Sequence, residues 1–132
     1  GKYWQNACAD LVPVVMFQSI KSDVDLNKVI ASSDKPVFLD FYADWCRSCI
    51  EMEKKTFVDA RIRERMSRMT LVRVDMTAYT DDDAALLARF KLYGPPAMIV
   101  LEPITGKEKI RVVGFETADV FMRSLDAAAP KP

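Results

Sequence analysis

Apolar residues along this chain gather into runs that are typical of buried β-strands. Residues 37–42 form an almost continuous apolar run, which predicts a strand covered by helices on both faces and placed at the centre of a sheet. Shorter runs predict three further strands, at 71–76, 97–102 and 109–113. The last two are expected to form a hairpin through a turn at Thr105-Gly106.

The segments between these runs are expected to be helices. Their predicted extents are about 23–33, 46–55, 59–69, 84–92 and from 117 onward. Ser22 or Asp23 can cap the first helix, and the carboxylates at 81–83 can cap the fourth. Pro95 and Pro96 must end the fourth helix, because proline lacks the N–H that a helix needs.

The predicted order of elements, β-α-β-α-β-α-β-β-α, indicates an α/β fold with a central mixed sheet flanked by helices on both faces. Its first strand comes from an extended segment at 11–20, which Pro13 restricts to a sheet edge or a strand start. One domain is expected for 132 residues. We expect an N-terminal extension or linker at 1–16 that could carry the edge strand, a folded domain at 17–127 and a tail at 128–132.

Charge argues against two classes of partner. The chain has 19 basic and 19 acidic residues, so no net field selects a nucleic acid or an anionic membrane. It contains no apolar stretch of ~18 residues and no signal-peptide pattern. Because it begins with Gly1-Lys2 and not with Met, we expect a piece of a longer polypeptide, whose other parts could hold a membrane anchor.

Cys46 and Cys49 directly follow the central apolar run and open the next predicted helix. A strand, then Cys-x-x-Cys, then a helix is the layout of a dithiol/disulfide redox centre. Two intervening residues on a first helical turn bring the sulfurs within bonding distance, and the unpaired N–H groups of the helix start favour a thiolate. Cys46 is therefore predicted to be the exposed nucleophile and Cys49 the buried resolving thiol.

Other interpretations of this pair are weaker. A zinc site usually needs four nitrogen or sulfur ligands, but the chain has no histidine and one further cysteine, Cys8. A static disulfide across so short a loop would stabilise little. Two inert core thiols remain an alternative, although the polar pair Arg47-Ser48 is untypical of a core. A redox dithiol carries two electrons itself, so no metal or organic cofactor is expected. Cys8 is interpreted as an incidental thiol of the linker.

Two carboxylates could act on the sulfurs. Asp40 lies inside the apolar strand, where burial should raise its pKa, unless its side chain reaches a solvated strand end. Glu53 lies four residues after Cys49 and seven after Cys46, so all three fall on one helix face. The alternative for Glu53 is a solvated glutamate that pairs with a nearby lysine.

Aromatic and basic residues are interpreted more simply. Trp45 is predicted to shield one side of the sulfur, and Tyr42 beside the site could be strand packing. Four aromatic residues are assigned to the core or its margin: Phe57, Phe90, Tyr93 and Phe121. The arginines at 61, 63, 65 and 68 are expected to form a solvated helix face.

Two longer motifs extend the Cys-x-x-Cys pattern: LDFYADWC at 39–46 and EMEKKTF at 51–57. Over about residues 17–126 the chain resembles the C-terminal thioredoxin-like domain of the DsbD family of thiol:disulfide interchange proteins. The resemblance implies a thioredoxin fold, in which Asp40 accepts a proton from Cys49 and both Asp40 and Glu53 disfavour the thiolate of Cys46. It also implies a cis Pro95–Pro96 bond in a loop beside Cys46, where the carbonyl of Pro95 can pair with a substrate strand.

The chain departs from the family pattern in two places. Arg47-Ser48 replaces a small apolar pair between the cysteines, which bears on the reduction potential. Pro95-Pro96-Ala97 stands where a single proline before threonine is usual, which bears on partner fit.

The function that this resemblance implies is that of a periplasmic reductase domain in a bacterial inner-membrane protein. Such a domain receives electrons from a membrane-embedded dithiol and delivers them to an N-terminal periplasmic domain, which serves disulfide isomerases and cytochrome c maturation. Two alternatives remain open. One is a free-standing thioredoxin-like reductase, and the other is a non-catalytic binding module with the same fold.

Overall fold

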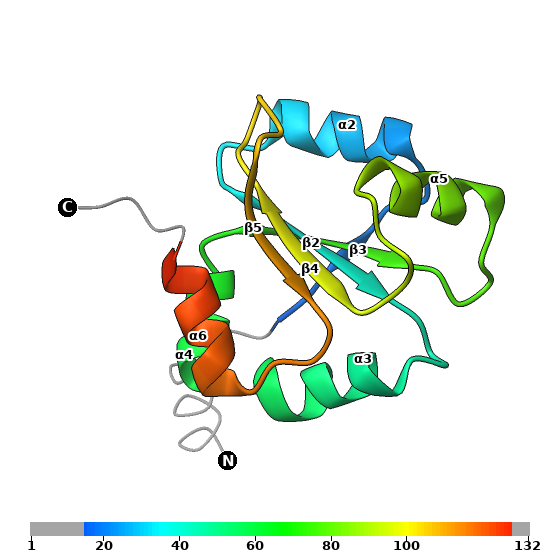
Figure 1. Ribbon diagram of the computed structural model, residues 1–132. Helices are drawn as coiled ribbons and strands as arrows, with labels where there is room; N and C mark the ends of the chain where they lie inside the picture. Colours follow the sequence, from blue (N-terminus) through cyan, green and yellow to red (C-terminus); the bar gives the residue numbers. More distant parts are fainter. Residues whose placement is uncertain (1–14, 128–132) are drawn as a thin grey trace, which may run out of the picture.

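A five-stranded mixed sheet separates two groups of helices in the computed structural model, which describes residues 15–127 (Figure 1). The elements in chain order are β1 (Gln18–Ser19), α2 (Asp23–Ser32), β2 (Val37–Tyr42), α3 (Arg47–Glu51), the π-helical turn η1 (Met52–Thr56), α4 (Ala60–Met66), β3 (Thr70–Asp75), α5 (Asp81–Arg89), β4 (Ala97–Leu101), β5 (Glu108–Val113) and α6 (Ala118–Ala127).

The strand order β1-β3-β2-β4-β5 places β2 at the centre, as its apolar run predicts. β1 and β2 each run parallel to β3, whereas β4 is antiparallel to both β2 and β5. Residues of β2 alternate between the two faces, so the strand is covered on both sides. The predicted α/β fold with a central mixed sheet is confirmed.

Each face of the sheet has its own apolar core. α2 and α5 cover one face, and the two cysteines join this core at the end of β2, where α3 begins. η1, α4 and α6 cover the opposite face, where four phenylalanine rings pack with centroids 5.9–6.3 Å apart: Phe17, Phe38, Phe57 and Phe121. Asp40 follows Phe38 by two residues in β2, so its side chain projects toward the second face.

Several predicted elements differ in extent from those observed. The extended segment at 11–20 contributes only Gln18–Ser19 to the sheet, and residues 11–14 lie outside the described part. The helix predicted at 46–55 is divided, because an i→i+5 bond from Phe57 N to Met52 O (2.8 Å) turns its second half into η1. Of the carboxylates at 81–83 that are predicted to cap α5, Asp83 does so, in a reciprocal capping box with Thr80.

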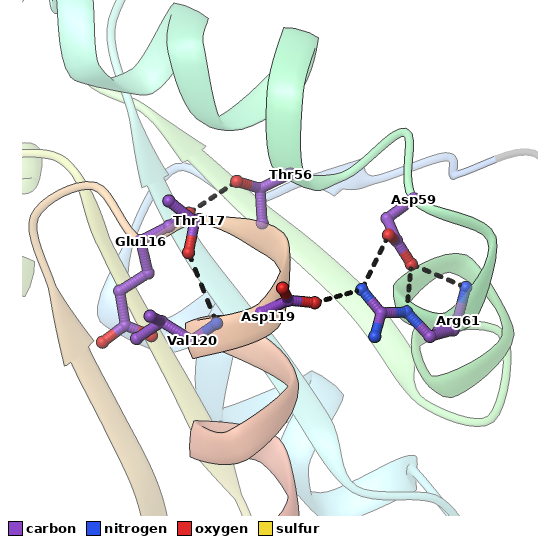
Figure 2. A network of polar contacts seen from close by, with 7 residues as sticks. All are labelled: Thr56, Asp59, Arg61, Glu116, Thr117, Asp119 and Val120. Atoms are coloured by element: carbon purple, nitrogen blue, oxygen red, sulfur yellow. Dashed lines mark hydrogen bonds and ion pairs between the residues drawn. The ribbon is translucent and has the colours of Figure 1, made fainter.

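Polar contacts join η1, α4 and α6 on the second face (Figure 2). The buried Thr56 hydroxyl donates to the carbonyl oxygen of Glu116 at 2.5 Å. Arg61 pairs with Asp59 at 3.0 Å and with Asp119 at 2.8 Å, which links the start of α4 to the start of α6. These exposed ion pairs contribute little to stability, whereas the buried Thr56 bond contributes more.

The arginines at 61, 63, 65 and 68 are exposed or half-buried along α4 and just after it, as expected for a solvated face, and three of them are ion-paired. In addition to Arg61, Arg65 pairs with Asp126 of α6, and Arg68 pairs with Glu64 one turn earlier. These partners account for the basic stretch without a polyanion.

Candidate active site

The dithiol lies where β2 ends and α3 begins. Cys46 and Cys49 form a disulfide, with Cα atoms 5.2 Å apart. Cys46 caps α3, because its Sγ accepts a hydrogen bond from the N–H of Cys49 at 3.2 Å. The prediction that this spacing brings the two sulfurs within bonding distance is confirmed.

Both cysteines are buried. Cys46 is 7% exposed and Cys49 is 3% exposed, so the prediction of an exposed Cys46 is wrong for this disulfide form. The cause is the apolar cluster at the end of β2, in which both cysteines pack together with residues such as Phe41, Ala43 and Ala97. Cys49 is the deeper of the two, and its Sγ lies 3.9 Å from the carbonyl oxygen of Phe41.

Asp40 is the buried carboxylate that the sequence predicts. Its side chain is only 5% exposed, which excludes the solvated strand end. Arg73 Nε donates to Asp40 Oδ2 at 2.8 Å, and Arg73 Nη2 lies 2.8 Å from the same oxygen. Burial raises the pKa of Asp40 to about 6, although the Arg73 cation opposes this rise. The prediction of a raised pKa is confirmed.

Glu53 faces the same arginine from η1. Its Oε1 lies 2.6 Å from Arg73 Nη1, and its side chain is 38% exposed. The lysine pairing that we considered for Glu53 is not observed, because Lys55 pairs with Glu51. Asp40 and Glu53 thus share one cation on the second face of the sheet.

Arg73 is the residue that sequence reasoning missed. It is paired with Asp40 in the register of β2 and β3, and its guanidinium carbon lies 4.3 Å from the ring centroids of both Phe17 and Tyr42. A signal was present: an arginine inside the apolar run at 71–76 needs an anion if it is buried, as Asp40 needs a cation.

The proline loop precedes β4. The Pro95–Pro96 bond is cis, as predicted, and Pro96 is buried with its carbonyl oxygen accepting from Gly114 N at 3.0 Å. The next residue, Ala97, pairs with Phe41, whose carbonyl oxygen approaches Cys49. The loop therefore reaches the dithiol end of β2, while direct contact between Pro96 and Cys46 stays a prediction.

Comparison with known proteins agrees with this geometry. The sequence profile of the Thioredoxin-like family matches residues 20–103. The solved oxidised C-terminal domain of Neisseria meningitidis DsbD has a TM-score of 0.70 and 33% identity, and the match covers 87% of this chain and 100% of that one. The chain belongs to the DsbD C-terminal domains of the thioredoxin-like family.

Curated relatives agree with this assignment. The chain is 46% identical over 117 residues to the thiol:disulfide interchange protein DsbD of Ralstonia nicotianae, and 39% identical over 116 residues to that of Pectobacterium atrosepticum. Each match covers 86% of this chain. The chain spans about a fifth of the length of these relatives, 19% and 20%.

In this DsbD-type site, hydrogen bonds connect the residues just before Cys46 to the loop after β3. Trp45 is 57% exposed, and its indole N–H donates to the carbonyl oxygen of Thr77 at 3.1 Å. The N–H of Asp44 donates to Thr77 Oγ1 at 2.9 Å, and the Tyr42 hydroxyl donates to Asp44 Oδ1 at 2.9 Å. Burial, followed by this bond to Asp44, raises the pKa of Tyr42 to about 12.

One aromatic assignment was wrong. Phe57, Phe90 and Phe121 are buried as predicted, but Tyr93 is fully exposed. Tyr93 follows α5 in the segment leading to the proline loop, where its ring projects from the domain into solvent.

Within residues 15–127, no group of three or more histidine, cysteine, aspartate or glutamate side chains could hold a metal ion. No helix in that part of the chain is long and apolar enough to cross a membrane.

Proposed function

We propose that this chain is a thiol:disulfide reductase domain that works by dithiol–disulfide exchange through Cys46 and Cys49. The observation that carries the proposal is the Cys46–Cys49 disulfide at the end of the central strand, with the buried carboxylate of Asp40 in that same strand. No organic cofactor or metal takes part, because the dithiol itself carries the two electrons.

The reaction proceeds in two displacements. The Cys46 thiolate attacks a partner disulfide, which forms a mixed disulfide and releases one partner thiolate. Cys49 then attacks the sulfur of Cys46, closing the Cys46–Cys49 disulfide and releasing the second partner thiolate. Asp40 accepts the proton that Cys49 loses. With a pKa of about 6, Asp40 is mostly ionised at neutral pH and can act as this base.

The two carboxylates should also lower the reactivity of Cys46. Negative charge on Asp40 and Glu53 disfavours a thiolate on Cys46, so the reduced domain should attack arbitrary disulfides slowly. Partner specificity then arises from the rate of attack, because only a partner that changes the surroundings of Cys46 on binding would favour its thiolate. The partner-binding surface consists of Tyr42, Trp45, Pro95 and Pro96 around the dithiol.

The electron route follows the DsbD relationship. A membrane-embedded dithiol donates electrons to this domain, and an N-terminal periplasmic domain accepts them. The chain then acts as a periplasmic domain of a bacterial inner-membrane protein. The identity with DsbD relatives, of which this chain spans about a fifth, supports this route.

Insulin reduction tests the activity directly. The reduced chain, with Cys8 changed to serine, should accelerate the precipitation of insulin chains by a reductant. A matched protein with Cys46→Ser and Cys49→Ser should give only the uncatalysed rate. Equal activity of the two proteins would remove the dithiol from the function and favour a binding module.

A further inference from the structure

Three charged side chains meet on the face of the sheet that η1 covers: Asp40, Glu53 and Arg73. We propose that Arg73 is a positioning residue for the dithiol chemistry, which holds Asp40 ready to accept the proton of Cys49. The inference rests on the proposed function, because it concerns the step in which Cys49 attacks the mixed disulfide.

Arg73 engages one oxygen of Asp40 and leaves the other free for a proton. Nε donates to Oδ2, and Nη2 lies 2.8 Å from that oxygen without forming a hydrogen bond of its own. No hydrogen bond from the described residues reaches Oδ1. Asp40 can therefore take a proton on Oδ1 and still keep its contact with Arg73. Cys49 Sγ approaches the carbonyl oxygen of Phe41, the next residue of the same strand.

The arginine is held on several sides. Pairing of β2 with β3 sets its Cα opposite Asp40, and its guanidinium lies between the rings of Phe17 and Tyr42. Its side chain is 17% exposed. The contact to Glu53 at 2.6 Å fixes the remaining end of the guanidinium fork. A cation held in this way keeps a constant position beside Asp40.

The charge of Arg73 opposes the effect of burial on Asp40. Burial and the charge of Glu53 raise the pKa of Asp40, Arg73 lowers it, and the balance of these effects is a pKa of about 6. Without Arg73, only the two raising effects remain. Asp40 would then hold its proton to a higher pH, so a smaller fraction of it could accept a proton from Cys49 at neutral pH.

The surroundings supply a matched control. The charged and titratable groups near the pair are Glu53 from η1, Tyr42 and Asp75 from the strands, Arg63 from α4 and the dithiol of α3. Arg63 and Arg73 line one hollow of about 500 Å³. Arg63 Nε donates to the carbonyl oxygen of Phe57, and among the described residues Arg63 forms no ion pair. Arg63→Met therefore removes the same charge from the same hollow without touching Asp40.

A chromogenic disulfide separates the two displacements. The reduced chain, with Cys8 changed to serine, is mixed with dithiobis-nitrobenzoate, which accepts two electrons. Attack by Cys46 forms a mixed disulfide and releases the first nitrothiobenzoate. Attack by Cys49 on the Cys46 sulfur releases the second, closes the internal disulfide and leaves the Cys49 proton on Asp40. Stopped-flow absorbance records both phases across a pH series.

Arg73→Met should move the pH midpoint of the second phase upward by about one unit, which slows that phase about twofold at pH 7 and about tenfold at about pH 5. Arg63→Met should leave the midpoint close to that of the parent protein. Arg73→Lys keeps the positive charge but loses the forked guanidinium, so its midpoint should lie between those of Arg73→Met and Arg63→Met. In an Asp40→Asn background, the second phase should lose this pH dependence whether or not Arg73 is present. Equal midpoints for Arg73→Met and Arg63→Met would overturn the proposal.

Failure of the proposed function has a different signature. If the dithiol does not act in exchange, the parent protein shows no second phase, or a Cys46→Ala protein shows the same release. If Arg73→Met does not fold by circular dichroism, Arg73→Lys decides, and a midpoint equal to that of Arg63→Met would overturn the role of Arg73.

Discussion

Arg73 lies directly across from Asp40 in the parallel pairing of β2 and β3, and its Nε donates to Asp40 Oδ2 at 2.8 Å. A buried ion pair of this kind is weak evidence for a gain in stability, because removing both charges from water costs about as much as their attraction returns. Asp40 lies in β2, the strand that leads to the dithiol, so we interpret the ion pair as one that serves proton transfer.

The raised pKa of Asp40 predicts a pH-dependent stability. As pH rises, the unfolded chain releases this proton near pH 3.8, whereas the folded chain holds it to about pH 6. The stability that Asp40 contributes is therefore fully present below pH 3.8 and is lost as pH rises toward 6, by up to about 3 kcal/mol. Urea unfolding of the oxidised chain between these pH values measures the loss.

Asp40→Asn should flatten this part of the pH profile, because asparagine does not titrate. Asp34→Asn, at an exposed position, is the control and should leave the slope in place. An unchanged slope in Asp40→Asn would show that Asp40 has an ordinary pKa.

The two carboxylates should raise the pKa of Cys46 in the reduced domain. Asp40→Asn and Glu53→Gln should each lower it, by on the order of one pH unit, and the double change should lower it most. Thiolate ultraviolet absorbance during a pH titration gives the value, in a chain with Cys8 changed to serine. Glu51→Gln at the end of α3 is the matched control, because the Glu51 carboxylate pairs with Lys55. No downward movement in either variant would remove both carboxylates from the mechanism.

The two thiols should differ in trapping a partner. Cys46 is less deeply buried than Cys49, so Cys46 should attack the partner and Cys49 should release it. Cys49→Ala should accumulate a covalent complex with an oxidised partner, with a yield several-fold above that of Cys46→Ala. Non-reducing electrophoresis, again without Cys8, measures both yields. Comparable trapping by the two variants would mean that the nucleophile has been misassigned.

Thr56 should stabilise the join between η1 and α6. Its buried hydroxyl donates to the carbonyl oxygen of Glu116, so Thr56→Val leaves that oxygen unpaired and should cost about 1–3 kcal/mol. Thr56→Ser keeps the hydroxyl and should cost less. Urea unfolding compares the two variants. A larger loss in Thr56→Ser would assign the effect to the methyl group and not to the hydrogen bond.

Much of the fold could be predicted because its signals are local. The run at 37–42 became β2, and the cysteines that follow it became the start of α3. Asp40 was recognisable as unusual because a carboxylate inside an apolar strand must be paired or protonated. The division of the next helix into α3 and η1 was not predicted, because an i→i+5 turn leaves no distinct periodicity over five residues.

The sequence by itself determined the central strand, the dithiol at its end and the buried acid within it, because neighbouring residues carry each of these signals. Only the tertiary structure decided that Arg73, 33 residues from Asp40, is the partner of that acid. It also decided that Cys46 is buried and Tyr93 exposed. These outcomes depend on strand register and on how helices cover the sheet, and such contacts between distant segments leave no periodic pattern in the chain.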